Sequence, residues 1–194
     1  MKNILKYIGI TLFVILPILL AWAVLASPFK SHEGFDYLLI KQTIVIDAPV
    51  EKVFNYLGNS DNAQDWSVFV DHITCLNGDE VSDGKVGSER RCFVSEDEKG
   101  TQWDERITEV VPSKKRQLTI YNLEGFPITA QNLATEQIYE PFENKCKLSF
   151  TVFYKGAEPT WGEYFKTTLA AYRIKSIFKK NMYNIKKIVE SKQH

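Results

Sequence analysis

The chain has 194 residues, and its 24 lysines and arginines balance its 24 aspartates and glutamates, so the formal net charge at pH 7 is zero. This balance excludes a general nucleic-acid-binding protein, which would carry a strong basic excess. Cys75, Cys92 and Cys146 are scattered without a C-x-x-C pair. That spacing excludes a zinc site of the usual cysteine type. We expect buried structural cysteines, with one disulfide as the alternative if the domain lies outside the cytoplasm, and neither a metal nor a cofactor.

Residues 1–30 are interpreted as a transmembrane anchor or signal segment. No charged side chain occurs from Tyr7 to Phe29. A helix of this length can cross a hydrocarbon core of ~30 Å at ~1.5 Å per residue. Lys2 and Lys6 precede the segment without an acidic neighbour. The positive-inside rule then places the N-terminus in the cytoplasm and the following domain outside it, as a single-pass membrane protein.

A cleaved signal peptide is the alternative to an anchor. Val24-Leu25-Ala26 supplies small residues at the positions that signal peptidase needs for a cut before Ser27. The mature protein would then be exported and soluble. The uncleaved anchor is favoured, because the apolar stretch is longer than the ~7–15 residues of an ordinary signal core.

Residues 31–39 are predicted to form a linker, and residues 40–194 a single domain. β-Branched residues predict a first strand over 41–47. Pro49 then suits the first turn of a helix, and apolar residues recur at helical spacing up to Leu57. A second, short helix is expected from Asn62 to about Phe69.

The middle of the chain alternates extended segments with turn residues, which predicts an antiparallel meander. The expected strands are 73–76, 88–95, 102–111, 116–122, 134–141 and 145–154. A C-terminal helix is predicted from about Thr160 to Ser191. Its apolar stripe changes direction near Tyr172, which predicts a bend or two separate helices.

Five stretches of the sequence resemble the helix-grip (SRPBCC) superfamily, which includes polyketide cyclases, START-type lipid-transfer domains and the birch-pollen allergen family. They are IVIDAPVEKVF (44–54), DW (65–66), GKVGS (84–88), ITEVVP (107–112) and NIKKIVE (184–190). In particular, the chain resembles bacterial polyketide-cyclase-like proteins that carry an N-terminal membrane segment.

The resemblance implies an α+β helix-grip fold, in which a curved antiparallel sheet surrounds a long C-terminal helix. It further implies a cavity between sheet and helix for a hydrophobic ligand. The family has no universal catalytic motif, so no catalytic residue is transferred to this chain. Aromatic residues are abundant, and they either line such a cavity or simply fill the core. The candidates for ligand contact are Trp66, Trp103, Tyr121, Phe126, Phe150, Tyr154, Trp161 and Phe165.

Glu105 is the one concrete candidate for a catalytic acid or base. If the hairpin around residues 98–100 places Phe93 opposite Trp103, Arg91 lies opposite Glu105. On the cavity face this pair could steer a polar ligand group, whereas on the outer face it would be an ordinary ion pair. The outer face or the rim is favoured. Only His72 lies within the folded body, so a metal site built from several histidines or a Ser-His-Asp triad is not expected.

Three functions are compatible with these features. The favoured one is binding of a hydrophobic small molecule or lipid by a membrane-anchored domain, without catalysis. The second is a polyketide cyclase or dehydratase enzyme, which a buried, paired carboxylate beside an open pocket would favour. The third is a protein-interaction module with a filled, vestigial cavity.

Overall fold

A computed structural model of the chain describes residues 2–125, 132–156 and 159–191, with the backbone alone for 2–12 and 14. The elements are α1 (Lys2–Leu25), β1 (Leu39–Ile46), α2 (Val50–Gly58), the short 3₁₀ helix η1 (Ser60–Asn62), α3 (Ala63–Trp66), β2 (His72–Cys75), β3 (Glu89–Phe93), β4 (Gln102–Val111), β5 (Lys115–Glu124), β6 (Leu133–Phe142), β7 (Lys145–Tyr154) and α4 (Trp161–Ser191).

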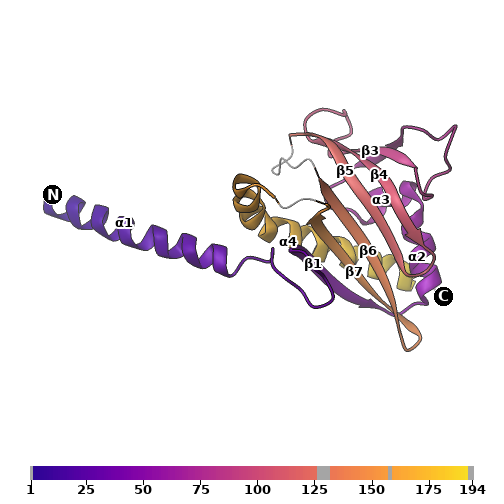
Figure 1. Cartoon of the computed structure of the whole chain (residues 1–194), viewed down its shortest axis with the longest axis horizontal. Coiled ribbons are helices and arrows are strands. Elements are labelled where there is room, and N and C mark those ends of the chain that lie inside the picture. Colours follow the sequence, from indigo (N-terminus) through magenta and orange to yellow (C-terminus); the bar gives the residue numbers. More distant parts are fainter. Residues whose placement is uncertain (1, 126–131, 157–158, 192–194) are drawn as a thin grey trace.

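The strands form one antiparallel sheet in the order β1-β7-β6-β5-β4-β3-β2. Strands β2 to β7 are each paired with the next along the chain, and β1 closes the order against β7. The sheet is curved, α4 runs along one of its faces, and α1 projects away from the domain (Figure 1). This is the α+β helix-grip arrangement that the sequence predicts.

The main core lies where α2 and the second half of α4 pack on the sheet. The buried face of α2 carries Val50, Val53, Phe54 and Leu57, at the spacing that places side chains on one side of a helix. These side chains pack with Leu148 of β7 and with Met182 and Ile185 of α4, among others. Burial of this apolar surface fixes the second half of α4, so the first half can border a cavity.

The segment before β1 packs onto the domain at two places. Phe29 is buried against Tyr154 and Tyr164, with ring centroids 6.1 Å and 5.8 Å apart. Tyr37 stacks on Phe153 at 4.4 Å, on the outer face of the sheet. This contact explains why Phe153 is buried although it faces away from the core formed by Leu148.

Three predicted details differ from the structure. The second helix ends at Trp66, before the expected Phe69, because the chain turns back where the Ser67 hydroxyl accepts the backbone N–H groups of Phe69 and Val70. The C-terminal helix α4 is one continuous helix and not two. Its apolar stripe changes direction because its two halves face different surroundings, a cavity and a packed core. Cys75 is exposed, whereas Cys92 and Cys146 are buried.

Within the part of the chain whose side chains are described, no helix has both the length and the apolar character needed to cross a membrane. The transmembrane helix predicted over residues 7–29 therefore has no support from the structure.

Candidate ligand-binding cavity

A cavity of about 590 Å³ lies between the inner face of the sheet and the first half of α4. Its apolar lining includes Trp66, Trp103, Ile120, Phe150, Ile174 and Phe178. Sheet residues reach it because alternate side chains of β4, β5 and β7 point to one face. On α4 the lining residues recur every three or four positions from Phe165 to Asn181, which defines one helical face.

A buried ion pair lies in the wall of this apolar cavity. Arg90 of β3 pairs directly with Glu105 of β4, and the side chains of both are about nine-tenths buried. The Glu105 Oε2 atom accepts from Arg90 Nε at 2.8 Å and lies 2.7 Å from Arg90 Nη2. The Glu105 Oε1 atom accepts from the indole N–H of Trp103 at 3.0 Å. Both carboxylate oxygens are therefore held in place.

The pair alters the electrostatics of its neighbours. Burial disfavours the charged guanidinium of Arg90, but the adjacent Glu105 carboxylate raises its pKa above the ordinary value. Burial, and then the nearby Glu105 carboxylate, raise the pKa of the Cys92 thiol well above 9.0. Cys92 also lines the cavity. Its thiol thus stays protonated, which removes it as a nucleophile.

In addition to Glu105, further polar groups hold the Arg90 side chain. Its Nη1 atom donates to the Ser60 hydroxyl at 2.8 Å. The Ser60 hydroxyl and backbone N–H in turn both donate to the Asp83 carboxylate at 2.7 Å. These contacts fix the guanidinium in one orientation, so the polar end of the cavity is preorganised.

The sequence prediction for this hairpin was wrong by one residue. Glu105 lies opposite Arg90, and Arg91 lies opposite Asp104. The connecting loop has six residues between the paired Val94 and Thr101, where the prediction assumed an odd number centred on Glu98. Because side chains alternate faces, this slip moves Arg91 to the outer face. Glu105 lines the cavity, where the prediction favoured the outer face or the rim.

The aromatic candidates fall into three groups. Trp66, Trp103, Phe150 and Phe165 line the cavity. Tyr121, Tyr154 and Trp161 do not. Tyr121 lies opposite Asp104 on the outer face, Tyr154 is covered by Phe29, and Trp161 is 82% exposed at the start of α4. Phe126 lies outside the described residues.

Several lining residues had no signal in the sequence. Arg90 was not recognised, because the predicted register placed Arg91, and not Arg90, opposite Glu105. Leu169, Arg173 and Ile177 were treated as ordinary helix residues, although they border the cavity. Their position depends on the gap between α4 and the sheet, which helical spacing alone does not reveal. Among the described residues, no three His, Cys, Asp or Glu side chains are placed together as metal ligands.

A protein-family model described as "Polyketide cyclase / dehydrase and lipid transport" matches residues 38–190. The chain belongs to this family. Together with the cavity, membership makes it a ligand-binding helix-grip protein. No curated protein matches the chain.

Solved structures agree on the fold. A Thermobifida fusca protein is 16% identical, with a TM-score of 0.61, covering 80% of this chain and 95% of its own. A protein from Thermus thermophilus, TTHA0849, is 12% identical, with a TM-score of 0.59, covering 80% and 99%. DynU16, from the dynemicin biosynthetic locus, is 11% identical, with a TM-score of 0.56, covering 78% and 47%. At these identities the likeness concerns the fold alone.

Proposed function

We propose that the protein binds a hydrophobic small molecule or lipid in the cavity between α4 and the sheet. The observation that carries the proposal is a mostly apolar cavity of about 590 Å³ whose wall includes the fixed polar side chains of Arg90 and Glu105. Small-molecule sites have volumes of about 300–1,000 Å³ and this same mixture of apolar walls and convergent polar groups. A filled cavity would instead have favoured the protein-interaction module.

The chemistry of the lining defines the class of ligand. Apolar walls stabilise a bound hydrocarbon by about 25 cal/mol per Å² of surface removed from water. Arg90, Ser60 and Gln137 border the same space and can receive one polar end of the ligand. The indole N–H of Trp66, another lining residue, is buried without a hydrogen-bond partner. The expected ligand is mostly apolar with one hydrogen-bonding end.

The proposal includes attachment to a membrane, with the N-terminus in the cytoplasm and the domain on the other side. Its support is the sequence, because residues 7–29 contain no charge. The end of α1 also contacts the cavity helix, since Tyr172 Oη donates to the Ala23 carbonyl and Ser27 Oγ to that of Thr168, both at 2.7 Å. A tether at α1 would hold the cavity beside the bilayer, where it could load lipid directly.

Attachment is tested by carbonate extraction of membranes and by the N-terminal mass of the mature protein. An intact N-terminus in the carbonate-resistant pellet supports the anchor. A mature chain that begins at Ser27 in the soluble fraction overturns it and indicates an exported binding protein.

A cyclase or dehydratase enzyme is the second candidate, favoured by the buried Glu105 carboxylate in the cavity wall. Binding ranks first because Arg90 and Trp103 already occupy both oxygens of this carboxylate. A carboxylate whose two oxygens are held in this way is poorly placed to exchange a proton with a substrate. In the enzyme, Glu105→Gln would abolish turnover of a bound polyketide while leaving its binding intact. In a carrier, no turnover exists to lose.

Native mass spectrometry of the full-length protein, extracted from its own membrane, tests binding directly. A co-purifying species of lipid mass supports the proposal and identifies the ligand class. Ala170 lines the cavity, and Ser176 on the same helix is exposed and does not. Ala170→Phe should therefore expel the ligand and Ser176→Phe should retain it. Repeated recovery of empty wild-type protein, or equal loading of both variants, would contradict the proposal.

A further inference from the structure

A second pocket lies outside the apolar cavity, between the end of α2 and the loop that precedes β3. Its volume is about 510 Å³, and its lining includes Phe54, Gly58, Lys85 and Arg116. Phe54 and Arg116 are buried and form the floor, whereas Lys85 is exposed at the rim. The pocket therefore brings a buried cation and a solvent-accessible cation to one space.

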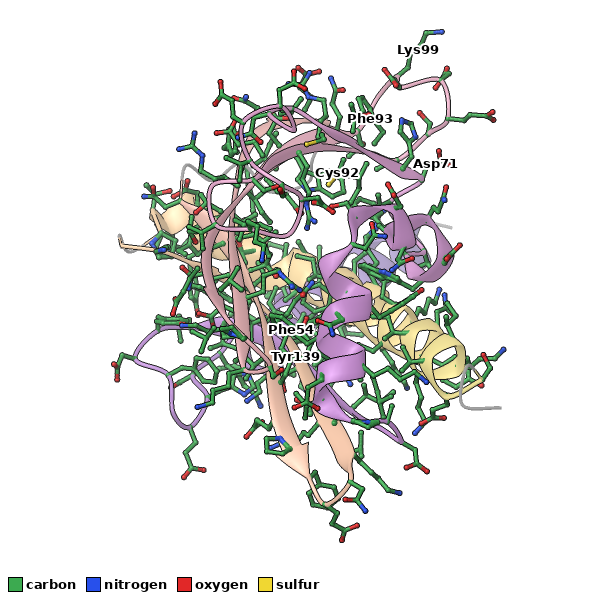
Figure 2. All side chains as sticks on the ribbon, turned by 90° about the vertical axis from the view of Figure 1, so that its right-hand side faces the viewer. Phe54, Asp71, Cys92, Phe93, Lys99 and Tyr139 are labelled. Carbon is green, nitrogen blue, oxygen red and sulfur yellow. The ribbon has the colours of Figure 1, made fainter. Side chains whose placement is uncertain are left out.

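Arg116 has only neutral partners. Its Nη1 atom donates to Gln137 Oε1 and to Tyr139 Oη, both at 3.2 Å. Its guanidinium carbon lies 4.5 Å from the centre of the Phe54 ring. Phe54 of α2 and Tyr139 of β6 lie next to each other (Figure 2), with ring centroids 5.1 Å apart. Arg116 Nε is buried without a hydrogen-bond partner, and no carboxylate in the described part of the chain forms an ion pair with Arg116.

A buried charge without a counter-charge is unusual, because desolvation costs several kcal/mol per ion in general. Arg90, at 9% exposure, has Glu105 as its ion-pair partner, whereas Arg116, at 3% exposure, forms no ion pair with any described residue. Burial lowers the pKa of Arg116 below its ordinary value, despite opposing effects from Tyr139 and Asp83. Asp83 therefore offsets the buried charge of Arg116 only in part, and an anion bound beside Arg116 would stabilise that charge further.

Gly58 makes room for the guanidinium at this place, and Gly84 makes room for the backbone of Gly58. A Cβ atom on Gly58 would lie 2.8 Å from Arg116 Nη2, and one on Gly84 would lie 2.6 Å from the Gly58 carbonyl oxygen. The one acid in the described lining, Asp83, already accepts two hydrogen bonds from Ser60. Lys85 forms no ion pair among the described residues, so neither cation of the pocket is held by a carboxylate there.

We propose that this pocket binds a phosphate group, either free or carried by a lipid headgroup. The planar fork of Arg116 suits two oxygens of one oxyanion, and the flexible Lys85 ammonium can close over it as a point charge. The inference does not rest on the proposed function of the apolar cavity, because the two pockets share only the Asn59 position among their described lining residues.

The test is calorimetric titration of inorganic phosphate into the full chain at constant ionic strength. Arg116→Lys keeps the charge but loses the fork, and should weaken binding about tenfold or more. Gly58→Ala pushes the fork away and should act in the same direction. Lys85→Gln, at an exposed position that tolerates substitution, should weaken binding about two- to fivefold.

Lys99→Gln is the matched control for Lys85→Gln. Lys99 is exposed at the tip of the β3–β4 hairpin, away from Phe54 and Tyr139 (Figure 2), and should have no effect. No saturable phosphate binding, or equal affinity for wild type, Lys85→Gln and Gly58→Ala, overturns the proposal and leaves Arg116 a purely structural residue.

Dioctanoyl phosphatidic acid distinguishes the two sources of phosphate. If the phosphate belongs to a lipid whose chains enter the apolar cavity, Ala170→Phe weakens binding of this lipid but not of inorganic phosphate. If the phosphate is free, Ala170→Phe changes neither affinity. Both results support the site. If only the proposal for the apolar cavity is wrong, inorganic phosphate still binds to the second pocket and Lys85→Gln still weakens that binding. The two proposals can therefore fail separately.

Discussion

Two ion pairs occupy neighbouring positions of the β3–β4 hairpin but face opposite sides of the sheet. Arg90 and Glu105 point into the apolar cavity, and the side chains of both are nearly excluded from water, at 10% and 12% exposure. Arg91 and Asp104 lie on the outer face, where Asp104 is buried but the Arg91 side chain is 38% exposed. A difference of one residue in the register therefore separates a buried ion pair, Arg90–Glu105, from a partly solvent-exposed one, Arg91–Asp104.

The difference indicates how the two pairs serve the protein. Arg91 can keep part of its hydration, so the outer pair is an ordinary stabilising contact with good bidentate geometry, at 2.6 Å and 2.9 Å. The buried Arg90 side chain cannot keep its hydration, so its charge is stabilised mainly by Glu105. A charge pair inside an apolar wall is a weak stabiliser relative to apolar residues. Under the proposed function, this pair would serve to orient the ligand.

Removal of the cavity carboxylate should have the largest effect. Glu105→Ala leaves the Arg90 guanidinium buried without its partner, and should lower the free energy of unfolding by about 3–5 kcal/mol. Urea unfolding of the full chain, followed by tryptophan fluorescence, measures this change.

The double variant Arg90→Met/Glu105→Leu is the control for that prediction. It removes both charges and keeps the space filled, so it should be clearly more stable than Glu105→Ala alone. If the single and double variants unfold at the same urea concentration, the unpaired charge of Arg90 is not the cause of the lost stability.

Removal of the outer carboxylate should cost less. Asp104→Asn loses charge-assisted hydrogen bonds from Arg91, about 1.5–3 kcal/mol, while water can still reach the guanidinium. The same urea unfolding experiment gives the value. A cost equal to that of Glu105→Ala would mean that the two faces do not differ in the way proposed here.

The sequence predicted much of this hairpin but not its register. Strand β4 has the predicted bounds, and the predicted β3 contains the observed one. The error lies in the loop, where Glu98 takes a positive φ of 56° beside Gly100 at 87°. A glutamate gives no sign of a left-handed conformation, whereas a glycine does. Two residues with positive φ shape a six-residue loop, and the register follows from its length.

The cavity was predictable as a family property, but its lining was not. Trp66 and Trp103 line it and Tyr154 does not, although all three are large aromatic residues near predicted strands or helices. Tyr154 is covered by Phe29, a residue of the segment before the domain. Arg116 was missed for a similar reason, because its environment is made by α2 and by a distant glycine loop. Such contacts depend on tertiary packing, and periodicity within one element carries no information about them.

Acid should remove the stabilisation by the outer pair only at a pH below the range in which ordinary carboxylates become neutral. Hydrogen bonds from Arg91, and then from Asn122, hold the pKa of Asp104 below its ordinary value of 3.8, against the effect of burial. Its stabilisation is therefore complete well above pH 3.8, the value for the unfolded chain, and is lost as the pH falls through the lower folded value. Urea unfolding at a series of acidic pH values should show a steeper decline for wild type than for Asp104→Asn. Parallel curves would exclude Asp104 as the titrating group.

The smallest effect is expected at His72, which lies further along the outer face. Its Nδ1 atom lies 2.9 Å from Asp71 Oδ2, and its Nε2 atom 3.4 Å from Glu98 Oε1. The hydrogen bond with Asp71, and that with Glu98, raise the pKa of His72 above 6.5 in spite of some desolvation. The stabilisation is thus complete below pH 6.5 and is lost as the pH rises through the folded value.

Solvent limits the size of the His72 effect, because the two acids are 44% and 57% exposed. The loss between pH 6 and 9 should lie at the low end of roughly 0.2–1 kcal/mol, and high salt should abolish it. Wild type and His72→Gln are compared by thermal unfolding across this range, with Glu98→Gln as a variant that removes only the more distant acid. If His72→Gln keeps the same pH dependence as wild type, the histidine pairs contribute nothing. The graded series from Glu105 through Asp104 to His72 then rests on its first two members, which differ because water reaches only one of their arginines.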